Sequence, residues 1–165
     1  MVAGKETAVF VVNKWLEQDP VLLNLFGKTI HIYPGYADEP EGGAPSYPYI
    51  RYHHIPVISK MQNIRKDYVQ YFVGDKDFDR MENILERLMY ILDSDQTTTH
   101  IAVPDVSGKY RIDDIMVRSG TMPHQPSQDE GVWEHGIQMA LVYVIRSHDW
   151  GEPKNRVSFM DALLS

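Results

Sequence analysis

Cysteine is absent from the 165 residues of the chain. The chain can therefore form no disulfide, no thiolate metal site and no cysteine nucleophile, which is compatible with a reducing cytoplasm. Long apolar runs are also missing, because no stretch approaches the roughly twenty apolar residues that a membrane-spanning helix needs. The N-terminal "MVAGKETAVF" lacks the basic segment and apolar run of an export signal. We expect an unexported protein with no membrane partner.

Positive charge is scarce relative to negative charge. Lys and Arg together number 16 and Asp and Glu 23, which gives a formal net charge of −7. Affinity for nucleic acid comes mostly from Lys and Arg that displace counterions, so tight binding of DNA or RNA is disfavoured. The length suits a single domain over residues 1–165, large enough to bury roughly two thirds of its unfolded surface.

Sequence motifs for nucleotide and ester chemistry are missing. The stretch "FGKT" has Leu22 at the position where a phosphate-binding loop needs its first glycine, and it precedes a predicted strand rather than a helix. No GxSxG nucleophile elbow occurs. The pair Asp113 and Asp114 and the run "SQDE" could supply an acid and a base, but neighbouring acids in polar loops are usually solvated. We expect no enzyme activity and no cofactor.

The histidines show no metal-binding spacing. His53 and His54 are adjacent in a predicted strand, so their side chains point to opposite faces and cannot readily share a metal. A zinc site would need folding to bring together some of the other five: His31, His100, His124, His135 and His148. We expect surface or half-buried histidines and no metal.

The stretch "VGDKDFDRMENILERLMYIL" can be interpreted as a calcium loop or as the start of a helix. Its acids match EF-hand loop positions one, three, five and twelve: Asp75, Asp77, Asp79 and Glu86. Arg80, however, stands where that loop needs a glycine. Apolar residues recur at helical spacing from Met81 to Leu92, and Asp79 followed by Glu82 is typical of a capping box. The pattern favours a helix over calcium.

The remaining pattern predicts an α+β fold. A helix is expected from about Glu6 to Phe26, interrupted at Asp19-Pro20 and ended by Gly27. Strands are expected near residues 28–35, 47–58, 67–75, 110–120 and 132–148, the last of them central. This order predicts an antiparallel or mixed β-sheet with two main helices packed on one face and a short C-terminal helix or tail, "VSFMDALLS".

Two long segments, 36–46 and 121–131, are rich in proline, glycine and acids and are expected to be loops. Long loops on a compact domain are often functional or disordered, and the C-terminal apolar segment could pack on a neighbouring subunit or on its own core. The candidate interface residues are Asp38, Glu39, Glu41, Pro45, His124, Gln125, Asp129, Glu130, Phe159 and Leu163.

The order of elements from Lys5 to Ser147 resembles the tail-terminator and tail-completion proteins of long-tailed bacteriophages. The matching features are a helix ending in "LFG", the strand "TIHIYPG", "YPYIRY" with its Pro48-Tyr49-Ile50, the strand-to-helix stretch at "YFVGDKDFDRMENILERLMYIL", and the late strand "WEHGIQMALVYVI". The chain differs from that pattern between Gln96 and Val132.

The resemblance implies a structural virion protein at the head–tail junction, assembled in the host cytoplasm. Such a subunit forms a ring, expected to be a hexamer, that caps the tail tube and joins it to the head. Its partners would be copies of itself, the tail-tube protein and a head-completion or neck protein, with DNA passing through the lumen without specific binding. The alternatives are a neck or head-completion protein of the same virion, a small metal-dependent or hydrolytic enzyme, and a monomeric binding module.

Overall fold

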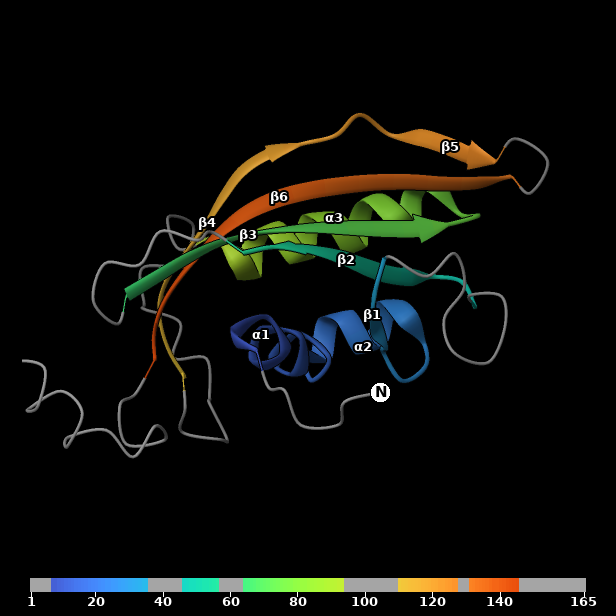
Figure 1. Ribbon diagram of the computed structural model, residues 1–165. Coiled ribbons are helices and arrows are strands. Elements are labelled where there is room, and N and C mark those ends of the chain that lie inside the picture. The colour runs from blue at the N-terminus through green and yellow to red at the C-terminus, as the bar shows by residue number, and fades with distance from the viewer. Residues whose placement is uncertain (1–6, 36–45, 57–63, 94–109, 128–130, 146–165) are drawn as a thin grey trace, which may run out of the picture.

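The chain folds into two helices, three strands, a third helix and three further strands, in a computed structural model that describes residues 7–35, 46–56, 64–93, 110–127 and 131–145 (Figure 1). The helices are α1 (Ala8–Leu16), α2 (Pro20–Phe26) and α3 (Phe78–Leu92). The strands are β1 (Ile32–Pro34), β2 (Tyr49–Ile55), β3 (Ile64–Asp75), β4 (Tyr110–Gly120), β5 (His124–Ser127) and β6 (Val132–Ile145).

The N-terminal helical region is interrupted where the sequence predicted. The first helix ends at Leu16 with Glu17 as its C-cap. Asp19 caps the second helix, since its carboxylate accepts a hydrogen bond from the Leu22 amide at 2.9 Å, and Pro20 occupies the first helical position. Gly27 closes α2 with a φ of 65°, a left-handed conformation that favours glycine. The predicted single helix is thus two short helices joined by a tight corner.

Helix α3 confirms the helical interpretation of the acidic stretch but corrects its first residue. The N-cap is Asp77, whose carboxylate accepts from the Arg80 amide at 3.1 Å, so the predicted capping box of Asp79 and Glu82 is wrong. Asp79 instead lies in the first turn, where its charge complements the helix dipole. Asp75 is buried at the end of β3 and is bound by both the Nε and Nη2 atoms of Arg80.

The sheet is mixed, as predicted, and has six strands. Five of them follow the order β1-β2-β3-β6-β4, with β1 parallel to β2 and the other neighbours antiparallel, while β5 also pairs with β6. The predicted central position of 132–145 is confirmed, because β6 lies between β3 and β4. The long antiparallel pair of β3 and β6 therefore lies in the interior of the sheet.

All three helices pack on one face of this sheet (Figure 1). That face presents alternate residues of β6, Ile137, Met139, Leu141 and Tyr143, whose side chains join the hydrophobic core. From α1, buried Asn13 accepts a hydrogen bond from the hydroxyl of Tyr71 on β3 at 2.7 Å. The described helices leave the opposite face of the sheet uncovered, and we call it the second face.

The predicted loop 121–131 is wrong at its centre, because residues 124–127 form strand β5 and continue the edge begun by β4. Gly131, with a φ of 65°, begins the return into β6. The edge is irregular: its pairing with β6 shifts register between Ile112 and Asp114 and again between Val117 and Ser119. Pro126 lies in β5, where the edge position tolerates a residue without an amide donor. The polar residues of this strand, "HQPS", show no alternating apolar pattern, so no sign of a strand is visible in the sequence here.

Within the described residues, none of the helices combines the length and the apolar character that crossing a bilayer requires.

Candidate functional site

A row of side chains runs across four strands on the second face of the sheet. In register, Tyr49 of β2 lies opposite Gly74 of β3, Gly74 opposite Glu134 of β6, and Glu134 opposite His124 of β5. Cross-strand neighbours on one face lie close enough for side chains to interact, so this register alone gathers polar groups from elements up to 85 residues apart.

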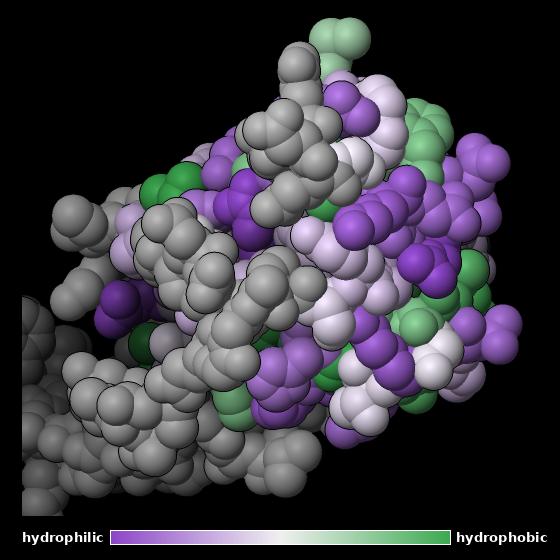
Figure 2. Space-filling view, turned by 90° about the vertical axis from the view of Figure 1, so that its right-hand side faces the viewer, coloured by the Kyte–Doolittle hydropathy of each residue, from purple (hydrophilic) through white to green (hydrophobic). Residues whose placement is uncertain are grey.

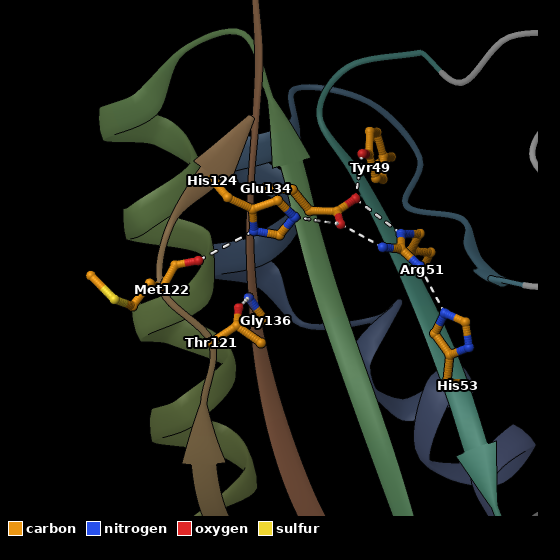
Figure 3. A network of polar contacts seen from close by, with 8 residues as sticks. All are labelled: Tyr49, Arg51, His53, Thr121, Met122, His124, Glu134 and Gly136. Carbon is orange, nitrogen blue, oxygen red and sulfur yellow. Dashed lines mark hydrogen bonds and ion pairs between the residues drawn. The ribbon is translucent and has the colours of Figure 1, made fainter. Parts of the chain in front are cut away.

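Glu134 is the centre of this network (Figure 3). Its Oε2 accepts hydrogen bonds from the Tyr49 hydroxyl at 2.7 Å and from the Arg51 Nε at 2.9 Å, and its Oε1 is bound by the Arg51 Nη2. The Nε2 atom of His124 lies 3.7 Å from Oε1. Glu134 is only 2% exposed although it sits on the face without helices, so its charge is held by partners rather than by water.

Arg51 is positioned by a second set of contacts. Its guanidinium carbon lies 4.2 Å from the centroid of the Phe72 ring, a cation–π geometry, and its Nη1 atom lies 2.7 Å from the His53 Nε2. Because an arginine only donates, His53 must accept through Nε2, which requires the neutral imidazole with its proton on Nδ1. Burial, together with the charge of Arg51, lowers the pKa of His53 and so favours this neutral form.

Two glycines make the close approach possible. A Cβ atom on Gly74 would lie 2.0 Å from the ring carbon Cζ of Tyr49, and one on Gly136 would lie 2.6 Å from Cδ1 of Phe72. The rings of Tyr49 and Phe72 therefore occupy the space of missing side chains on the neighbouring strands. At Gly136 the backbone is also held from the β4–β5 side, since its amide donates to the Thr121 hydroxyl at 2.9 Å.

The arrangement stabilises a fixed charge rather than a reactive one. Burial by itself opposes ionisation of Glu134, but hydrogen bonds from Arg51 and Tyr49 and the charge of Arg51 outweigh it and hold the pKa of Glu134 below its usual value. The same burial and hydrogen bond raise the pKa of the Tyr49 hydroxyl. With both carboxylate oxygens bonded and the side chain buried, Glu134 ties β2 to β6 across β3.

Acid is expected to weaken the fold through Glu134. Its pKa is depressed in the folded state, so its contribution to stability is complete above the unfolded value of about 4.5 and is lost as the pH falls below that value toward the folded pKa. Urea unfolding of the wild type and of Glu134→Gln between pH 7 and pH 3 should show their difference in unfolding free energy shrinking with acid. Asp113→Asn, at an exposed site outside the network, serves as the control, and a pH-independent difference for Glu134→Gln would contradict the assignment.

Of the candidate interface residues, the structure describes His124 and Gln125. Both lie in β5, and His124 contacts the Glu134 network through the 3.7 Å approach given above; its Nδ1 also lies 3.2 Å from the carbonyl oxygen of Met122. The other eight lie outside the described residues: Asp38, Glu39, Glu41, Pro45, Asp129, Glu130, Phe159 and Leu163.

The prediction that His53 and His54 point to opposite faces of the sheet is confirmed. His53 faces Arg51 on the second face, whereas His54 lies on the helix-bearing face with its Nε2 2.7 Å from the Asp67 carboxylate, which also accepts from the Tyr143 hydroxyl. His135 contacts Glu82 of α3 through Nδ1 at 2.6 Å. Among the described residues, no group of three His, Asp or Glu side chains is arranged to hold a metal ion.

The acidic pair in β4 does not converge on a shared site. Asp113 accepts from the Arg111 Nε at 2.9 Å on an exposed stretch, and Asp114 pairs in register with Val142 of β6.

Figure 2 shows the end of the molecule where α3 and β6 begin, and there hydrophilic and hydrophobic residues are interspersed over the visible described surface. A contact made at this end would be of mixed polarity.

Sequence analysis missed Tyr49, Arg51 and Glu134 as a connected group. The signal that could have found them is the pair of glycines inside strong strand patterns, Gly74 in "YFVGD" and Gly136 in "WEHGIQM". A glycine in a strand interior often marks the close approach of another group. The strand register that places Gly74 beside Tyr49 and Gly136 beside Phe72 depends on the packing of the whole sheet, so the sequence around each glycine does not reveal it.

Searches found no protein-family model that matches the chain and no match among curated proteins.

Proposed function

We propose that the chain is a subunit of a ring that terminates the tail tube of a long-tailed bacteriophage and joins it to the head. The observation that carries the proposal is the one-sided helical layer. Half-buried Arg51, His53 and Phe72 lie on the second face, which no described helix covers. A large sheet with a helical layer on one side is well suited to use its other side against a neighbouring subunit.

Two further features support this function. The α+β architecture is the fold class that the resemblance to tail-terminator proteins implies. The net charge of −7 suits a ring that DNA crosses without being held, because carboxylates repel the phosphate backbone. No catalysed reaction and no cofactor are part of the proposal.

Light scattering on the purified protein, alone and mixed with the tail-tube protein of the same virus, tests the proposal. We expect a closed assembly of about six times the 19.0 kDa of the chain, and negative-stain images with rings at the ends of tubes. A protein that stays monomeric in both conditions would contradict it. Rings that bind a head-side completion protein and never the tube would instead favour the neck-protein alternative.

A further inference from the structure

A ring of identical subunits that meet head to tail needs two different complementary surfaces on every chain. Two separate parts of the described structure carry charges of opposite sign that no ion pair within the described residues uses. One is on the exposed side of α3, and the other is at the start of β3. The inference drawn from them rests on the proposed ring.

The first surface is a narrow stripe along α3. Asp79, Asn83, Glu86 and Tyr90 are all exposed and follow one another at helical spacing on a single line of the helix. Arg80 binds Asp75, and Arg87 binds Asp19 while its guanidinium carbon lies 5.3 Å from the centroid of the Tyr90 ring. Asp79 and Glu86 take part in none of the ion pairs among described residues. We call these four residues the acidic stripe.

The second surface lies where β2 ends and β3 begins, on the second face. Ile64, Lys66 and Tyr68 alternate along that face of β3, and Ile55 of β2 is paired in register with Tyr68, so the four are contiguous. Ile55 and Ile64 are 46% and 50% exposed, high values for isoleucine in a strand. The Nζ atom of Lys66 lies over the Tyr68 ring at 5.7 Å and has no carboxylate partner among the described residues. We call these residues the basic patch.

Arg65 adds a second cation at the same end of β3. It faces the other side of the sheet, in register with Tyr143, and its Nε is a buried donor with no hydrogen-bond partner among the described residues. An unsatisfied buried donor costs about 1–3 kcal/mol, so native structures rarely keep one without a reason. Arg65 and Lys66 thus place one cation on each face of the sheet at this end of β3, and the cation that the second face offers to another molecule is Lys66.

We propose that the basic patch of one subunit binds the acidic stripe of α3 of the next subunit around the ring. The two surfaces match in charge and in kind. Each combines ionic groups with exposed apolar or aromatic side chains, which suits an interface better than charge alone. They also match in length, since eleven helical steps from Asp79 to Tyr90 span roughly 16 Å and four strand steps from Ile64 to Tyr68 span roughly 13 Å.

Two charge-reversed variants test the pairing. The patch variant carries Ile64→Glu and Lys66→Glu, and the stripe variant carries Asp79→Lys and Glu86→Lys; three of the four positions are exposed and Lys66 is half-buried. Each variant alone places like charges opposite each other at every junction. We expect the concentration for half-maximal ring assembly to rise about tenfold or more in each. Lys14→Glu on α1, outside both surfaces, should leave assembly unchanged.

Mixing the two variants should restore rings. In an alternating ring, the native stripe of one copy meets the native patch of the other, and the reversed stripe meets the reversed patch. A single chain that carries all four substitutions should assemble for the same reason. Circular dichroism and thermal unfolding of each variant separate loss of folding from loss of assembly.

The outcomes distinguish this interface from the proposed function itself. Wild-type rings together with assembly of both reversed variants at wild-type concentration would overturn the pairing and leave the ring function intact. Loss of assembly in each variant without rescue in the mixture would show that both surfaces matter but do not contact one another, and it would also overturn the pairing. A wild-type protein that stays monomeric with and without tube protein would overturn both the pairing and the proposed ring function.

Discussion

Replacement of Glu134 by alanine is expected to lower the unfolding free energy by about 3–5 kcal/mol, because it removes a buried carboxylate and leaves the half-buried Arg51 guanidinium without its charge partner. The Tyr49 hydroxyl loses its acceptor at the same time. Chemical denaturation at neutral pH measures the loss. Few single substitutions away from the core should cost this protein as much.

A matched acidic residue provides the control. Glu82 also contacts a basic side chain, His135, but is half-exposed, so Glu82→Ala should cost less than about 1 kcal/mol. Replacing both members of the buried pair, with Glu134→Leu and Arg51→Met, should recover much of the stability because neither charge is then left unpaired. Equal losses for Glu134→Ala and Glu82→Ala would argue against a stabilising role for the network.

Gly74→Ala is expected to destabilise the fold by about 2–3 kcal/mol, although alanine in a strand interior usually stabilises relative to glycine by up to about 1 kcal/mol. The added methyl group would lie 2.0 Å from Cζ and 2.4 Å from the hydroxyl oxygen of Tyr49, so the ring must move. That movement separates the hydroxyl from Glu134. Thermal or urea unfolding of the variant gives the size of the effect.

The same substitution in a Tyr49→Ala background isolates the clash. Without the ring, the alanine at position 74 has room, and the double variant should be as stable as Tyr49→Ala alone or slightly more stable. A cost for Gly74→Ala that is the same in both backgrounds would mean that the ring is not what excludes a side chain there.

The architecture was predictable from sequence because its signals are local. The helix break at Asp19-Pro20, the helix end at Gly27 and the alternation along 132–145 each depend on residues a few positions apart, and all three are confirmed. The first residue of α3 was wrong by two positions because two aspartates, at 77 and 79, both satisfy the preference for an acidic cap. Only the backbone conformation, which is extended at Asp77, shows which of the two aspartates caps the helix.

The polar network was not predictable because register creates it. The local sequences "YPYIR" and "WEHG" do not predict that Tyr49 and Glu134 both lie beside Gly74 on the same face of the sheet. The pairing of β2, β3 and β6 that brings them there depends on packing of the whole sheet. The strand at 124–127 was missed for a related reason. Its residues "HQPS" have little intrinsic strand preference and form a strand because β6 supplies a partner.

The irregular edge formed by β4 and β5 disfavours strand pairing between copies of the chain. A regular edge offers consecutive unpaired amides and carbonyls to any passing strand, so copies of a chain can extend one sheet into filaments. Two register shifts in β4, a third in β5 and Pro126 break that template. In the proposed ring, neighbouring copies would then meet through side-chain recognition rather than through this edge, and such recognition fixes the angle between neighbours and so the number of copies at which the ring closes.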